Sequence, residues 1–350
     1  MPLKVVSLFS GAGGLDLGFE KAGFSTIWAN EFDRKIWATF ERNFPQAKLD
    51  RRSITDVSVE EIPDCDGMIG GPPCQSWSEA GAGRGINDKR GQLFYDYIRI
   101  LKVKQPKFFL VENVSGILSA RHKEAFTGFL KAFEDAGYVI NWKLVNANDY
   151  GVPEDRERVI IVGYRKDLGK KFEFPLPELH KPNLREAIGD LPEAVPALEK
   201  NKTNGKLSIA NHEYLTGGYS PIFMSRNRVR SWNEPSFTIQ AGGRQAPIHP
   251  KAPKMVKIGP NEQIFAKGHE DEYRRLSVRE CARIQTFPDE FEFIYTDVAD
   301  GYKMIGNAVP VNLAKAIATK IKEDLDNERP KQQPGESVRI CVSASVAARN

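Results

Sequence analysis

The chain has 350 residues, of which 41% are hydrophobic and 27% are charged, and its formal net charge is +4. This length is enough for a large core and a second, smaller unit, and the composition is that of a globular protein rather than a disordered or fibrous one. The sequence contains no long uninterrupted apolar run, which argues against a membrane-spanning helix.

The first half of the chain alternates short apolar runs with helical patterns, which is typical of a parallel α/β sheet. The predicted strands cover residues 5–9, 26–29, 108–111 and 159–162, with an antiparallel strand over 138–144. The predicted helices cover residues 14–22, 93–101, 126–133 and 313–325. Beyond residue 174 the periodicity weakens and Pro, Gly and basic residues dominate, which indicates a separate domain of short strands and loops.

A glycine-rich turn, residues 9–14 (FSGAGG), lies between the first predicted strand and the first predicted helix. Its glycines let a ligand approach the backbone closely. Glu31 ends the second predicted strand, where a carboxylate can accept both ribose hydroxyls of a nucleoside. The pattern favours an adenosine-type cofactor. It leaves open NAD and S-adenosylmethionine, as well as a plain tight turn without a ligand.

Cys74 follows two prolines, Pro72 and Pro73, and precedes a Gly- and Arg-rich stretch over residues 81–91. The prolines stiffen the turn, so the thiol is displayed on a rigid loop beside basic residues, as a nucleophile requires. Taken alone, Cys74 would more often be a small buried hydrophobe. The other cysteines, Cys65, Cys281 and Cys341, form no CxxC pair with it, and we expect a cytoplasmic protein without a structural metal or disulfide framework.

Glu112 comes directly after the predicted buried strand 108–111, at the carboxyl end where α/β sheets bind ligands. A partly buried carboxyl there can carry a proton at neutral pH, although a loop or capping carboxylate is the alternative. Arg156 and Arg158 precede the strand 159–162, and strand alternation predicts both guanidiniums on one face. They could bind a phosphate or a base carbonyl, or form an exposed charged strand end.

Basic residues gather between residues 221 and 260. Seven Arg and Lys residues stand there against one acidic residue, Glu234, a local net charge of +6. Such a patch fits a polyanionic partner, with a solvated basic face as the alternative.

Together these segments resemble the DNA cytosine-5 methyltransferases, in the family's order, over residues 3–325. The matching segments are residues 9–14, Glu31, 72–75 (PPCQ), 112–114 (ENV), 156–158 (RER), 275–280 (RLSVRE) and 306–310 (GNAVP). The resemblance implies an α/β, Rossmann-like methyltransferase sheet in a catalytic domain of residues 1–175 and 300–326. It further implies a mostly β and loop target-recognition domain over 176–299, followed by a disordered tail over 327–350.

The resemblance also implies a mechanism. A cytosine is swung out of duplex DNA, Cys74 adds to its C6, and Glu112 contacts its N3 while C5 attacks the methyl group of S-adenosylmethionine. Arg158 is implied as a donor to the cytosine O2, and Arg156 as its structural or phosphate-contacting neighbour. No metal takes part, and the product of the cofactor is S-adenosylhomocysteine.

The cofactor contacts that the resemblance implies are Phe9, Gly11, Gly13, Glu31, Phe32, Ser53, Ile54, Pro73, Leu93 and Asn307. Two of them depart from the family's pattern. Phe32 replaces a common tryptophan, and either ring can stack on adenine. Ser53 stands where an aspartate usually binds the adenine amino group, so that Asp50 or Asp56 is a candidate substitute.

Residues 223–230 and 237–240 carry a closer resemblance to bacterial restriction-modification methylases that read GGCC. The DNA contacts that it implies are Ser76, Arg84, Arg226, Arg228, Arg230, Gln240 and Arg244. Residues 226, 228 and 230 alternate, which in an extended segment aims their side chains to one side. We expect a monomer that methylates the inner cytosine of GGCC in duplex DNA, alongside a restriction endonuclease that it does not bind. A catalytically silent DNA-binding relative and an RNA methyltransferase are the alternatives.

Overall fold

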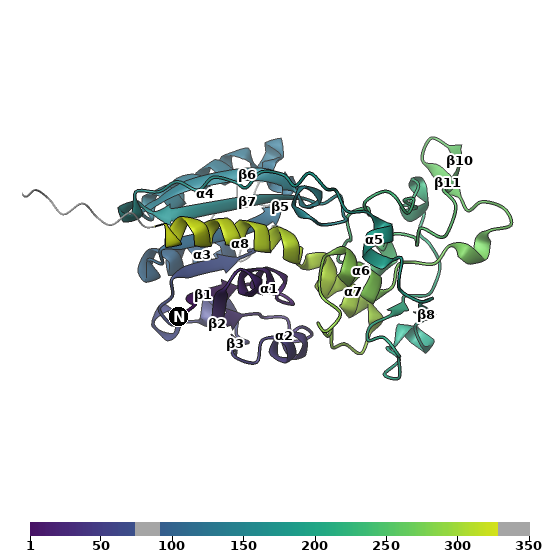
Figure 1. Ribbon diagram of the computed structural model, residues 1–350, viewed down its shortest axis with the longest axis horizontal. Helices are drawn as coiled ribbons and strands as arrows, with labels where there is room; N and C mark the ends of the chain where they lie inside the picture. The colour runs from purple at the N-terminus through teal and green to yellow at the C-terminus, as the bar shows by residue number, and fades with distance from the viewer. Residues whose placement is uncertain (74–91, 328–350) are drawn as a thin grey trace, which may run out of the picture.

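The computed structural model describes residues 1–73 and 92–327, and its centre is a seven-stranded sheet (Figure 1). The strand order is β3-β2-β1-β4-β5-β7-β6. The strands are β1 (Leu3–Leu8), β2 (Phe24–Asn30), β3 (Lys48–Asp50), β4 (Gly67–Gly70), β5 (Phe108–Val114), β6 (Tyr138–Asn146) and β7 (Glu157–Arg165). Strands β1 to β5 pair in parallel, whereas β7 runs antiparallel to both of its neighbours. The predicted α/β, Rossmann-like sheet is therefore confirmed.

Helices cover both faces of this sheet (Figure 1). One face packs against α1 (Gly14–Lys21) and α8 (Val311–Asp326), and the other against α3 (Gln92–Lys104) and α4 (Lys123–Asp135). Side chains of β5 alternate between the two faces of the sheet. Phe108 and Leu110 pack in the core on the side of α1 and α8, whereas Phe109 and Val111 pack in the core on the side of α3 and α4. Every strand and helix predicted from the sequence overlaps one of these elements.

The second part of the chain is built from short elements and long connections. It contains α5 (Leu184–Ile188), β8 (Val195–Pro196), β9 (Glu213–Tyr214), β10 (Val256–Gly259), β11 (Glu262–Ile264), α6 (Val278–Ile284) and α7 (Val298–Asn307). The sequence did not predict α6 and α7. The predicted domain boundary between residues 299 and 300 also needs correction, because it falls inside the helix α7.

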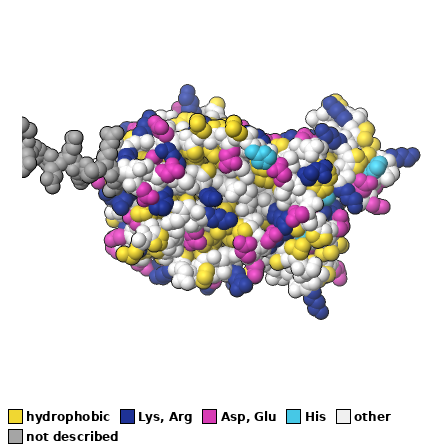
Figure 2. Space-filling view, in the orientation of Figure 1, with side chains coloured by type: hydrophobic (Ala, Val, Ile, Leu, Met, Phe, Trp, Pro, Cys, Tyr) yellow, Lys and Arg dark blue, Asp and Glu magenta, His cyan; other side chains and the backbone are white. Residues whose placement is uncertain are grey.

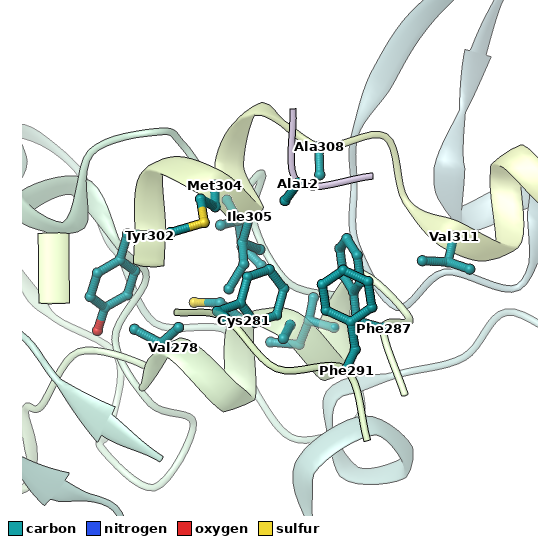
Figure 3. Close-up of a cluster of buried hydrophobic side chains, with 14 of the residues drawn as sticks. Ala12, Val278, Cys281, Phe287, Phe291, Tyr302, Met304, Ile305, Ala308 and Val311 are labelled. Carbon is teal, nitrogen blue, oxygen red and sulfur yellow. The ribbon is translucent and has the colours of Figure 1, made fainter. Parts of the chain in front are cut away.

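A shared hydrophobic core joins the two parts, and α2 (Trp37–Asn43) contributes to it. Figure 3 shows Ala12, from the glycine-rich turn, beside Ala308 and Ile305, close to the rings of Phe287 and Phe291. The core therefore holds α6 and α7 against the turn that follows β1.

Among residues 1–73 and 92–327, no helix combines the length and apolarity needed to cross a membrane. Within the same residues, no group of three or more His, Cys, Asp or Glu side chains is arranged to hold a metal ion. The predicted disordered tail falls on residues 328–350, outside the described part of the chain.

Candidate active site

One cavity of about 1130 Å³ lies at the carboxyl ends of the parallel strands. Its wall contains both residues predicted to bind the cofactor and residues predicted to be catalytic. The predicted cofactor contacts in the wall are Phe9, Gly11, Glu31, Phe32, Ser53, Ile54, Pro73, Leu93 and Asn307, and the predicted catalytic residues are Glu112 and Arg158. Ligands of open α/β sheets bind at this edge of the sheet.

The turn after β1 and the end of β2 form one side of the cavity. Gly11 has a φ of +54°, and a Cβ added to it would meet no atom within 4 Å, so the backbone is open to a ligand. The backbone N–H of Gly11 donates to Glu31 Oε2 at 2.9 Å, and that of Asp33 donates to Glu31 Oε1 at 2.7 Å. Phe32 follows with 71% of its surface exposed. The cavity thus presents a fixed carboxylate beside an exposed aromatic ring.

Gly13, another predicted cofactor contact, does not line the cavity. Its φ is +89°, and a Cβ at this position would lie 2.2 Å from the ring of Phe44. Backbone conformation and packing against Phe44, which follows α2, therefore both require a glycine here.

A short segment after β3 forms the neighbouring wall, where Ser53, Ile54 and Thr55 line the cavity. Ser53 Oγ and Thr55 Oγ1 are hydrogen-bonded at 2.8 Å. Asp50 and Asp56, the candidate substitutes for the missing aspartate, do not line it, and Asp50 is paired with Arg52 at 2.6 Å. The cavity wall therefore presents the hydroxyls of Ser53 and Thr55 where the resemblance predicts an aspartate. Thr55 was not identified from the sequence.

The far end of the cavity holds an ion pair between β5 and β7. Arg158 Nε donates to Glu112 Oε1 at 2.8 Å, and both side chains are 11% exposed. In the antiparallel ladder Arg158 lies opposite Val114, so Glu112 is its diagonal neighbour on the same face. Strand β5 continues to Val114, which corrects the prediction that Glu112 follows the strand.

Asn113, next to Glu112, fixes the turn that leads to Cys74. Its Nδ2 donates to the carbonyl of Pro72 at 3.0 Å. A Cβ added to Gly71 would lie 3.0 Å from Glu112 Oε2, so the glycine allows the turn to pass close to this carboxylate. Cys74 itself, together with Ser76 and Arg84, lies outside the described residues.

Arg156 is not at the cavity, contrary to the predicted shared face with Arg158. Its side chain is fully buried, and its guanidinium donates to the carbonyls of Ile239, Gly306 and Ala308 at 2.7–3.0 Å. Burial lowers the pKa of Arg156 to about 10. With these three acceptors it links the start of β7 to the second part of the chain, so of its two predicted roles the structural one fits this geometry.

The family model for C-5 cytosine-specific DNA methylases matches residues 3–323 of this chain. The chain belongs to that family. It is a DNA cytosine-5 methyltransferase, as the order of its motifs predicted.

The methylase is similar to curated proteins along nearly its whole length. It is 60% identical to the Type II methyltransferase M.FnuDI of Fusobacterium nucleatum, over 95% of this chain and 98% of that protein. It is 58% identical to the Type II methyltransferase M.NgoPII of Neisseria gonorrhoeae, over 93% and 97%. The solved structure of the Entamoeba histolytica methyltransferase EhMeth shares its fold, with a TM-score of 0.67, 17% identity, and coverage of 93% and 99%.

The predicted DNA contacts of the methylase take three different environments. Arg226, Gln240 and Arg244 are exposed, and neither arginine forms an ion pair with any residue the structure describes. Arg228 is 7% exposed and donates to the carbonyls of Phe223 and Ile222.

Arg230 is held by two carboxylates, those of Asp155 at 2.8 Å and Glu234 at 3.4 Å. Residues 226–230 belong to no named strand, although the backbone of Arg226 is extended and Val229 forms an isolated bridge with Ile248. Arg226, Arg228 and Gln240 line a second, smaller hollow of about 300 Å³, together with Asp155.

Sequence reasoning missed Lys303, which also lines the large cavity. Lys303 lies four residues before Asn307, a spacing that places both side chains on one face of a helix. The sequence did not predict that α7 is helical, so this spacing could not be used to find Lys303.

Proposed function

We propose that this methylase transfers the methyl group of S-adenosylmethionine to C5 of the inner cytosine of GGCC in duplex DNA, within a restriction-modification system. The single observation that carries the proposal is the continuous cavity, in which a nucleoside-type wall with Glu31 and Phe32 runs on to the Glu112–Arg158 pair. Two reactants can therefore meet in one enclosure, which transfer of a group between them requires.

The described residues fit S-adenosylmethionine at the first of these walls. The carboxylate of Glu31 is fixed by two backbone N–H groups and faces the cavity, as recognition of a ribose diol requires. Phe32 offers an exposed ring on which adenine can stack. Gly11 keeps the backbone accessible. When bound, this cofactor supplies the methyl group.

Glu112 and Arg158 serve the cytosine at the other end. The guanidinium of Arg158 suits the cytosine O2, and the carboxyl group of Glu112 suits N3 as a hydrogen-bond partner or proton donor. Neutralising the charge that builds up in the ring makes addition of the Cys74 thiolate to C6 favourable and C5 nucleophilic. Cys74 leaves when a base removes the proton from C5.

A cytosine reaches this enclosure only when it leaves the DNA stack. We infer that the second part of the chain holds the duplex and reads its sequence. Figure 2 shows Lys and Arg side chains at the end of the molecule that carries β10 and β11, and the exposed Arg226, Gln240 and Arg244 lie in this part. Exposed guanidiniums can bind guanine O6 and N7 in the major groove, which favours a guanine-containing site.

The assignment to restriction-modification rests on the relatives, because the proteins from F. nucleatum and N. gonorrhoeae are named Type II methyltransferases. The proposal is tested by incubating the enzyme with methyl-labelled S-adenosylmethionine and a duplex that contains one GGCC. A duplex of equal composition that contains GCGC, and transfer RNA, are the controls. We expect label in the GGCC duplex alone. Label in transfer RNA, or equal label in both duplexes, would contradict the proposed substrate.

A further inference from the structure

One face of α7 approaches both the cavity and the segment that follows β2. Asp300, Lys303 and Asn307 are spaced by three and four residues, so they lie on the same side of the helix. Lys303 and Asn307 line the cavity, whereas Asp300 pairs with Lys35 at 2.9 Å. The helix thus contacts the segment at two points, one inside the cavity wall and one outside it.

Inside the wall, Lys303 Nζ lies 2.7 Å from Asp33 Oδ2. Asp33 is also the residue whose backbone N–H donates to Glu31 Oε1. The ammonium group therefore holds the same residue that fixes the Glu31 carboxylate, and the chain of contacts runs from α7 through Asp33 to Glu31.

Electrostatics favours this contact. Glu31 and Asp33 are two positions apart in the chain, and both line the cavity. Burial raises the pKa of Glu31, and the backbone N–H groups of Asp33 and Gly11 lower it. The charge of Asp33 raises this pKa, and the charge of Lys303 lowers it. Without the ammonium group of Lys303, the repulsion between the carboxylates of Glu31 and Asp33 would be less well compensated.

We propose that Lys303 is a positioning residue for the nucleoside cofactor, which holds the Glu31–Asp33 segment in the conformation that accepts the ribose hydroxyls. This inference rests on the proposed cofactor. Lys303 acts through Asp33 on Glu31, and it links the ribose wall to the helix that also carries Asn307.

The outer pair, Lys35 with Asp300, is a matched control. It joins the same helix to the same segment, and the lysine side chains are similarly exposed, 55% for Lys35 and 45% for Lys303. Lys35 does not line the cavity. Loss of either pair removes a comparable surface contact, but only loss of the Lys303 pair disturbs the ribose wall.

The test measures the Kd of S-adenosylhomocysteine by calorimetry for the full-length enzyme. We expect Lys303→Met and Lys303→Gln to raise the Kd roughly fivefold, and Lys35→Met to change it less than about twofold. Lys303→Arg keeps the charge and should restore most of the affinity. Thermal unfolding of each variant checks that the fold is intact.

A second pair of ligands separates positioning from a general structural effect. Lys303→Met should weaken binding of adenosine but leave the weaker binding of 2′,3′-dideoxyadenosine unchanged, because that probe has no hydroxyls for Glu31. Equal losses for both probes, or equal losses in the Lys35 and Lys303 variants, would overturn the inference. If the unaltered enzyme bound no S-adenosylhomocysteine, the proposed cofactor itself would be wrong and the inference would fall with it.

Discussion

Glu112 lies at the end of the cavity where we propose that the cytosine reacts, so its substitution separates chemistry from binding. Gln keeps the size of the side chain but cannot donate a carboxyl proton to the cytosine N3. We expect Glu112→Gln to lower the turnover number roughly a hundredfold or more, the usual range for a general acid or base, with DNA affinity nearly unchanged. Single-turnover methyl transfer and DNA binding, both at pH 7, measure the two quantities.

Glu157 provides the control for this substitution. It begins β7 next to Arg158, is exposed and does not line the cavity. Glu157→Gln should therefore retain the unaltered rate. A wild-type rate in the Glu112 variant would remove this carboxyl group from the mechanism.

Arg226 tests whether arginines in the second part of the chain read bases or only bind phosphates. It is exposed and lines the smaller hollow, so its guanidinium is available to a guanine. Base reading predicts that Arg226→Ala relaxes specificity at one position of the site by about 1–3 kcal/mol, or roughly 5- to 150-fold.

Methylation rates on GGCC and on its single-base variants measure this specificity. Lys257→Ala is the comparison, because Lys257 is exposed on β10. Phosphate contacts alone predict uniformly weaker binding and a shallower salt dependence, and Lys257→Ala should show that behaviour. The same behaviour in Arg226→Ala would exclude base reading by this arginine.

Motifs at strand ends could be predicted from the sequence, because the carboxyl ends of parallel strands meet at one edge of the sheet. This is why Glu31 and Glu112 were found and why both line the cavity. The burial of Arg156 could not be predicted, because its three acceptors come from residues 239–308, far along the chain.

At the scale of elements, Gly306 marks the tightest contact between α7 and the segment that carries Gln240. A Cβ at this glycine would lie 2.3 Å from the backbone carbonyl carbon of Gln240. We expect Gly306→Ala to lower the free energy of unfolding by about 1–3 kcal/mol, as overpacking does, and to weaken S-adenosylhomocysteine binding through the adjacent Asn307. Thermal unfolding and calorimetry measure the two effects.

Gly128, within α4, is the matched control because a Cβ there would meet no atom within 4 Å. Gly128→Ala should be neutral or stabilise the protein by up to about 1 kcal/mol, since Ala is the better helix former. Equal stability of the two variants would contradict the packing argument.

Asp16 makes the stability of α1 depend on pH. Burial raises the pKa of this carboxyl to about 7, and the hydroxyl of Thr26 donates to its Oδ1 at 3.3 Å. The folded protein therefore binds a proton that the unfolded chain releases near pH 4, so the free energy of unfolding falls as the pH rises from about 4 to about 7. Asp16→Asn should remove this decline, which urea unfolding at several pH values measures. Parallel pH profiles for the variant and the unaltered protein would contradict the assignment.

Hydrophobic periodicity predicted the long elements of the sheet domain but not those of the second part. Helix α6 has seven residues, and all but Arg283 are buried, including Arg279 and Glu280. It therefore has no polar face from which a helical period could be recognised. Strand β3 has only three residues, too few for a pattern.

The whole molecule couples the second part of the chain to the cavity through buried contacts. The core around Ala12 and Tyr302, together with the three hydrogen bonds of Arg156, ties α6 and α7 to the sheet. The sequence indicated a change of character after residue 174, but it gave no sign of these contacts, because they join residues separated by more than 80 positions.

The central claim is methylation of the inner cytosine of GGCC, with Cys74 as the nucleophile. Bisulfite sequencing of DNA from cells that express this chain tests it most directly, with Cys74→Ser as the inactive control, because a hydroxyl ionises far less readily than a thiol. We expect protected cytosines at the inner position of GGCC on both strands and none in the Cys74→Ser cells. Protected cytosines at sites without consecutive guanines, or protection that persists in the Cys74→Ser cells, would contradict it.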